Sequence, residues 1–95
     1  MELTHSFGTI TIKGNIKSIS DFQEIKNICD SAVLANKSLH IDVVDSLSMT
    51  SSVIGYFTKL ILKDNIDLRI SVTNEQLFHL LDDLNLVSLF HVKKV

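Results

Sequence analysis

Three consecutive hydroxyl side chains, Thr50, Ser51 and Ser52, have the clearest potential for chemistry in this sequence. They follow a strand-like apolar segment and a short loop, and they precede a run of apolar residues with helical spacing. One of them is explained as a helix N-cap, because a serine or threonine oxygen that accepts a free backbone N–H contributes about 1 kcal/mol. The remaining hydroxyls lie at the positive end of a helix dipole, where a phosphate group is well tolerated.

No arrangement typical of catalysis or metal binding accompanies these hydroxyls. The four histidines have neither metal-ligand spacing nor a motif that joins them to a serine or cysteine; they are His5, His40, His79 and His91. The single cysteine, Cys29, excludes an internal disulfide and a multi-cysteine zinc site, and its position predicts a buried apolar residue. We therefore expect a protein that is not an enzyme and that has no metal and no cofactor.

Length, charge and hydropathy limit the remaining classes of function. The chain has 95 residues, enough for a single domain over residues 1–95. Its net charge is −2, and only one of its nine basic residues is an arginine, so a nucleic-acid partner is not expected. There is no apolar run of about 20 residues and no signal-peptide pattern at the N-terminus, so we expect a cytoplasmic protein without membrane insertion.

Hydrophobic periodicity predicts that strands and helices alternate along the chain. Two short strands around Gly8 come first, and a helix from Ser20 to about Ala35 follows, with Ser20 and Gln23 at capping-box spacing. The later expected elements are an interior strand at 39–44, a helix with its apolar stripe at 53–61, a strand at 68–72, a helix at 77–84 and a short final strand around Phe90 and Val92. Thr73 and Gln76 form a second capping box before the helix at 77–84, and Asn85 is expected to end that helix.

This order of elements predicts an α/β fold. Helical connections between strands are nearly always right-handed crossovers, which lay the helices on the sheet. We expect a mixed sheet of four to five strands with helices packed against it.

The segment from Ile41 to Leu60 resembles the central segment of STAS domains, the family named for sulfate transporters and anti-sigma factor antagonists. That family segment has an apolar-Asp-apolar strand, a loop, and Asp-Ser-Ser-Gly-Leu-Gly at the start of a helix. Here Asp42 matches the strand aspartate, Ser51 and Ser52 the paired serines, Ile54 the leucine and Gly55 the second glycine.

The resemblance extends over about residues 9–91. Leu68 to Val72 is similar to the next strand of the family, and Leu81 to Phe90 to its Leu-x-x-x-Gly-Leu-x-x-x-Phe ending, with Asn85 at the glycine. Gly14 is similar to the glycine of an early Gly-x-x-Asp turn. The resemblance implies a STAS-like fold with the same order of elements.

The resemblance also implies a function in bacterial signalling and transcription regulation. Family antagonists present the position of Ser51 to a partner serine kinase, which is also the anti-sigma factor that they bind, so Ser51, or alternatively Ser52, is the expected phosphorylation site. Thr50 replaces the family's aspartate, Val53 its first glycine, and Lys17 the aspartate of the early turn. Val53 and Thr50 favour an alternative, a constitutive STAS subunit of a transporter or signalling complex that is not phosphorylated.

Helical spacing predicts the surface that a protein partner would contact. The expected contact residues are Thr50, Ser51, Ser52, Gly55, Tyr56 and Lys59. Among them Tyr56, with Leu62 further along the helix, is expected to be exposed and to anchor the partner. A small-ligand or nucleotide-binding role is a third alternative, but the sequence contains no glycine-rich phosphate loop.

Overall fold

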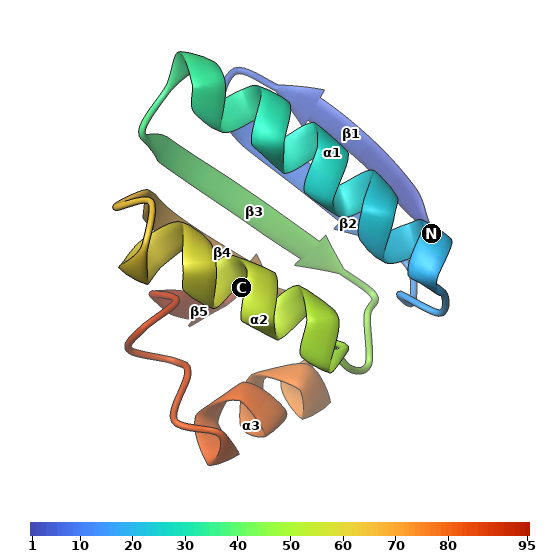
Figure 1. Cartoon of the computed structure of the whole chain (residues 1–95). Coiled ribbons are helices and arrows are strands. Elements are labelled where there is room, and N and C mark those ends of the chain that lie inside the picture. Colours follow the sequence, from blue (N-terminus) through green and yellow to red (C-terminus); the bar gives the residue numbers. More distant parts are fainter.

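Five strands form one mixed sheet in the order β1-β2-β3-β4-β5, and three helices pack against it (Figure 1). The computed structural model of the chain describes residues 1–95. Its elements are β1 (Glu2–Ser6), β2 (Thr9–Lys13), α1 (Ile19–Ala35), β3 (Ser38–Val44), α2 (Ser51–Leu62), β4 (Asp67–Val72), α3 (Glu75–Asp83) and β5 (Val92–Lys94). The predicted α/β fold, with a mixed sheet and packed helices, is therefore confirmed.

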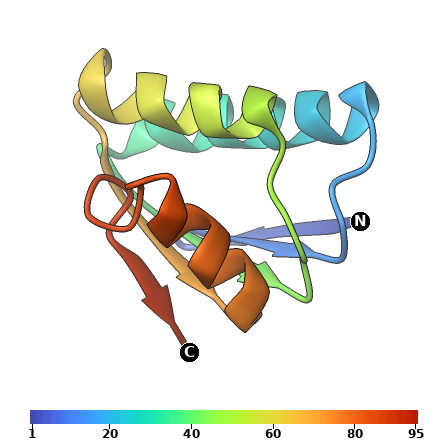
Figure 2. The ribbon, with the colours of Figure 1, turned by 90° about the horizontal axis from the view of Figure 1, so that it is seen from below.

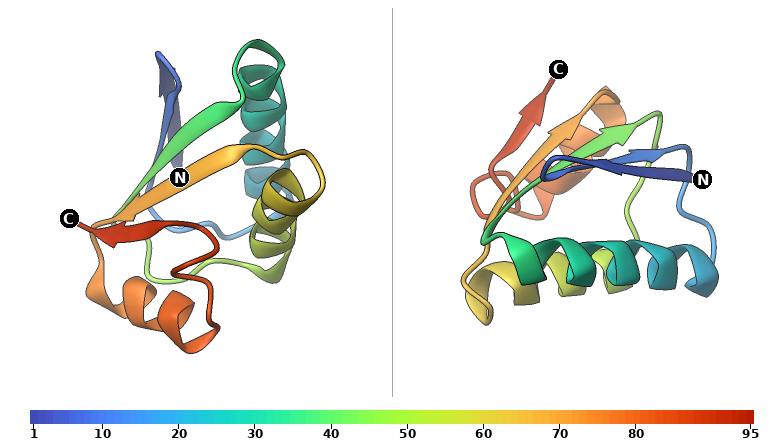
Figure 3. Two further views of the ribbon diagram at one scale, coloured as in Figure 1. Left: turned by 90° about the vertical axis from the view of Figure 1, so that its left-hand side faces the viewer. Right: turned by 90° about the horizontal axis from the view of Figure 1, so that it is seen from above.

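The connections place all three helices on one face of the sheet. β1 and β2 form an antiparallel hairpin, whereas β2, β3, β4 and β5 are parallel neighbours joined through one helix each. Successive right-handed crossovers in one direction lay their helices on the same side. Figure 2 shows α1 and α2 side by side over this face, and the left panel of Figure 3 shows α3 below β4 and β5.

The strands bury one face and leave the other open. The side chains that point toward the helices are buried aliphatics; in the three central strands they are Ile10, Ile12, Leu39, Ile41, Val43, Leu68, Ile70 and Val72. The alternate residues, such as Thr11, Asp42 and Arg69, are polar and at least partly exposed. β3 lies at the centre of the sheet, as its two partly apolar faces predicted.

Two predicted helix starts are wrong, because nearby side chains compete for the cap. The N-cap of α1 is Ser18, whose oxygen accepts the N–H of Asp21, so Ser20 lies inside the helix. The N-cap of α3 is Asn74 instead of Thr73. The predicted stop at Asn85 is confirmed, since this residue has a positive φ of 60° just beyond the helix.

No helix in the fold is both long and apolar enough to cross a membrane. The longest, α1, carries exposed charged side chains, including Glu24 and Lys26.

Candidate functional site

The start of α2 presents two serines that do not cap the helix. Thr50 is the N-cap, and its oxygen accepts the N–H of Val53 at 3.3 Å. Ser51 and Ser52 are the first two residues of the helix, and both are exposed. One of the three hydroxyls therefore has the expected capping role, and the two that the sequence singled out for modification are accessible.

The loop that leads to these serines is held from both sides. Ser46 is fully buried, and its hydroxyl donates a 2.6 Å hydrogen bond to the carbonyl oxygen of Gly14. The N–H of Leu47 donates to Oδ1 of Asn15 at 3.0 Å. On the other side, the N–H of Asp45 donates to the hydroxyl of Thr73 at 3.1 Å. These bonds tie the β3–α2 loop to both neighbouring loops, so the position of Ser51 is fixed.

Shallow grooves flank the start of α2. One lies between α2 and α1 and is lined by Lys17, Ser18, Ile19, Phe22, Thr50 and Ser52. The other lies toward α3 and is lined by Leu47, Ser48, Gln76, His79, Leu80 and Asp83. Each contains an exposed apolar side chain, since Ile19 is 77% exposed and Leu47 is 46% exposed. The surface around Ser51 thus combines hydroxyls with apolar groups that water does not solvate well.

The expected exposed tyrosine is a wrong prediction. Tyr56 is only 5% exposed, and its ring meets the edge of the Phe22 ring at a centroid distance of 6.3 Å. α1 packs along the side of α2 that carries Tyr56, and the spacing of one helix cannot reveal which neighbour covers it. Gly55 and Lys59, in contrast, are exposed as predicted, and so is Leu62.

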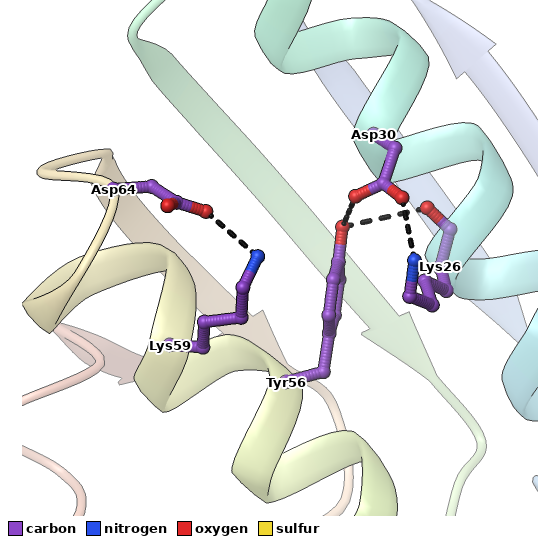
Figure 4. Close-up of polar contacts among 5 residues, drawn as sticks. All are labelled: Lys26, Asp30, Tyr56, Lys59 and Asp64. Atoms are coloured by element: carbon purple, nitrogen blue, oxygen red, sulfur yellow. Dashed lines mark hydrogen bonds and ion pairs between the residues drawn. The ribbon is translucent and has the colours of Figure 1, made fainter.

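A polar network joins α1 and α2 beside the exposed residues Gly55 and Lys59 (Figure 4). The hydroxyl of Tyr56 donates to Oδ1 of Asp30 at 2.5 Å, and Nζ of Lys26 pairs with Oδ2 of the same carboxylate at 2.8 Å. Lys59 pairs with Asp64 at 3.0 Å. A partner that uses the Lys59 ammonium would have to compete with this intramolecular ion pair.

Burial and hydrogen bonding shift the pKa values within this network. Desolvation and the hydrogen bond to Asp30 raise the pKa of Tyr56 far above its usual value. Partial burial raises the pKa of Asp30, but the bonds from Lys26 and Tyr56 and the charges of Lys26 and Lys59 outweigh it, so the net shift is downward. The tyrosine therefore stays neutral and the carboxylate ionised. This arrangement is that of a structural link between helices.

The histidines and the cysteine do not form a nucleophilic centre. Nε2 of His40 lies 2.8 Å from Oγ of Ser71 and 3.1 Å from Oδ1 of Asp42. Both contacts involve the same ring nitrogen, whereas a catalytic relay needs the hydroxyl and the carboxylate on opposite nitrogens. Cys29 is buried, and desolvation followed by the charge of Asp30 raises its pKa to about 12. No group of three or more potential side-chain ligands is arranged to hold a metal ion.

The structure brings together five of the six predicted contact residues on one accessible surface and excludes Tyr56. Sequence reasoning missed the residues that fix this surface, Asn15, Ser46 and Thr73, because their partners come from loops remote in sequence. No family model, no curated protein and no solved structure matches the chain.

Proposed function

We propose that this chain is a non-catalytic protein-interaction domain of the STAS type, which docks a protein partner at the start of α2 and is switched by phosphorylation of Ser51. The partner class is a serine kinase that also acts as an anti-sigma factor. One observation carries the proposal: Ser51 is exposed at the first turn of α2, on an anchored loop, between two grooves that each expose an apolar side chain.

The positions of the STAS-like motifs in the fold support this proposal. Asp42 lies on the central strand β3, and the paired serines open the helix that follows it. Asn85, at the position of a family glycine, has the left-handed backbone conformation that glycine adopts most readily. The sequence resemblance and the local backbone geometry are therefore consistent with each other.

A phosphate on Ser51 would change the surface without unfolding the domain. Phosphoserine carries about −1.5 to −2 charges, which the positive end of a helix dipole tolerates. A partner that packs on the apolar groups Ile19 and Leu47 would have to desolvate this charge or place an acidic group beside it. A loss of about 3 kcal/mol already weakens binding more than a hundredfold, which is enough for a switch.

The alternative is a constitutive subunit of a larger complex. Exposed apolar side chains near the proposed docking surface favour this second candidate. Ile19 and Leu62 are more than half exposed, on the two helices that flank the proposed docking surface. Val53, which replaces a family glycine, is fully buried and adds no accessible backbone. A permanently bound partner would cover these apolar groups without any phosphate.

Recovery of partners from the protein's own cell extract tests the two candidates. The bait proteins are the wild type, Ser51→Ala, Ser51→Asp and the neighbouring controls Ser52→Ala and Ser52→Asp. The switch predicts a phosphopeptide that contains Ser51 in mass spectrometry and a partner lost only with Ser51→Asp. A stoichiometric partner that all five baits retain, and that phosphatase does not release, selects the constitutive subunit. If none of the five baits recovers a partner, both the switch and the constitutive subunit are contradicted.

A further inference from the structure

A second polar groove lies on the open face of the sheet, opposite the helices. It crosses β3, β4 and β5 and is lined by His40, Arg69, Ile70, Ser71, His91 and Lys93. His40 is the register partner of Arg69, and Ser71 is the register partner of Lys93. Neighbouring strands of a sheet lie about 4.7–4.9 Å apart, so side chains from β3, β4 and β5 lie close together here.

The two charged side chains that line this groove, Arg69 and Lys93, are both basic. It contains the only arginine of the chain, two of its four histidines and one lysine. No aspartate or glutamate is among the lining residues. Carboxylates lie at its border, where Asp67 pairs with Arg69 at 3.7 Å and Asp42 contacts His40 at 3.1 Å, whereas Lys93 has no acidic partner.

Several hydrogen-bond donors in the groove are free to bind a ligand. Lys93 takes part in no ion pair, and the only ion pair of Arg69 joins its Nε to Asp67 at 3.7 Å, which leaves the two terminal nitrogens available. Nδ1 of His91 lies 3.0 Å from the carbonyl oxygen of Leu68. Because a carbonyl only accepts, this nitrogen carries the hydrogen, so Nε2 of the neutral ring is an acceptor, and His91 borders the groove without donating to an anion.

The imidazole of His40 is already oriented by its neighbours. Nε2 of His40 contacts Ser71 at 2.8 Å and Asp42 at 3.1 Å, and Asp42 is the register partner of Ser71. The carboxylate holds the imidazole beside the Ser71 hydroxyl. The hydroxyl therefore remains a donor or an acceptor at the floor of the groove.

We infer that this groove binds the phosphate group of a small molecule or free phosphate. The guanidinium of Arg69 and the hydroxyl of Ser71 come from β4 and the ammonium of Lys93 from β5, and a tetrahedral dianion has enough acceptor oxygens to accept from all three. The groove lies on the face of the sheet opposite α2. The inference therefore does not depend on the proposed docking surface at Ser51.

Titration of the isotope-labelled protein with inorganic phosphate, followed by amide chemical shifts in nuclear magnetic resonance, tests the inference. A parallel titration uses glycerol 3-phosphate, and sodium chloride at matched ionic strength is the control for screening. We expect saturable shifts at residues 69–71 and 91–93. Tighter binding of glycerol 3-phosphate identifies an organic phosphate as the ligand, and equal binding identifies the phosphate group alone.

Matched variants separate a site from general attraction to positive charge. Arg69→Gln and Lys93→Gln should each weaken phosphate binding about tenfold, as expected for loss of a charged hydrogen-bond donor. Lys94→Gln removes the same charge from the next residue of β5, whose side chain is on the other face of the strand, and should change affinity less than twofold. Both lysines and Arg69 are exposed, so the variants keep the fold. Shifts that do not saturate, that sodium chloride reproduces, or that Lys94→Gln weakens as much as Lys93→Gln overturn the inference.

Discussion

The phenolic O–H of Tyr56 on α2 donates a 2.5 Å hydrogen bond to Oδ1 of Asp30 on α1 (Figure 4). The same hydroxyl lies 3.4 Å from the carbonyl oxygen of Lys26, so it is held against α1 at two points. The bond joins the two helices whose N-terminal ends frame the groove beside Thr50 and Ser52. It therefore fixes the relative position of the two walls of the proposed docking surface.

Tyr56 should resist ionisation until the fold is lost. It is the only tyrosine, and the chain has no tryptophan, so ultraviolet absorbance reports the ionisation of this side chain alone. Its pKa is raised in the fold, so it contributes stability below the unfolded value of about 10, and this stability is lost as the pH rises toward the folded value. We expect phenolate absorbance and loss of helical circular dichroism to appear together, above pH 10. Phenolate formed in a still-folded protein near pH 10 would contradict this.

Removal of the hydroxyl should destabilise the domain without disturbing the ring. Tyr56→Phe keeps the aromatic contact with Phe22 and loses the bond to Asp30, which should lower the free energy of unfolding by about 1–2 kcal/mol. Urea unfolding measures this, and the cycle with Asp30→Asn isolates the pair. Additive effects of the two substitutions would show that the bond contributes nothing.

Acid should remove the contribution of Asp30. Its pKa is lowered in the fold, so the carboxylate stabilises the protein above the unfolded value of about 3.9, and the effect is lost as the pH falls through the lower folded value. The difference in unfolding free energy between wild type and Asp30→Asn should be constant near pH 7 and shrink below about pH 4. A difference that grows on acidification would show that the fold does not lower the pKa of Asp30.

Cys29 should react with thiol reagents only when the domain opens. It is fully buried, and its pKa of about 12 leaves almost no thiolate at neutral pH. As the only cysteine, it gives a single labelling rate, which should be slowed by orders of magnitude relative to the protein in urea. Tyr56→Phe should increase the labelling rate about tenfold for each 1.4 kcal/mol by which it lowers the free energy of unfolding. Labelling of the folded protein as fast as in urea would place Cys29 outside the core.

The sequence predicted the order of strands and helices, but it did not predict which elements pack against one another. Alternation of apolar residues predicted the central position of β3, and helical spacing predicted that Cys29 faces the core. Both patterns are properties of one segment. The burial of Tyr56 was missed because it depends on the packing of α1 against α2, which the spacing within α2 does not encode.

The candidate site likewise has features that local sequence predicts and features that arise only from the packing of distant segments. The exposure of Ser51 follows from the local signal for a helix start, and Thr50 takes the cap that the sequence required. The bonds of Ser46 and Thr73 join loops more than 25 residues apart in sequence, because they are separated by 32 and 28 positions from their partners. The basic groove on the open face arises from strand register, which brings Arg69 beside His40 only once the sheet is formed.

Gly55→Ala should separate stability from binding at the proposed docking surface. Gly55 is exposed in the interior of α2, and a Cβ atom there would meet no other atom within 4 Å. Alanine is favoured over glycine inside a helix by about 1 kcal/mol, so the variant should be more stable by about that amount in urea unfolding. A partner that packs on the exposed ridge between Ser52 and Lys59 would meet the added methyl group. We therefore expect weaker partner binding in a more stable protein, and Lys63→Ala, at the far end of α2, is the matched control. Unchanged binding by Gly55→Ala would move the docking surface away from this ridge.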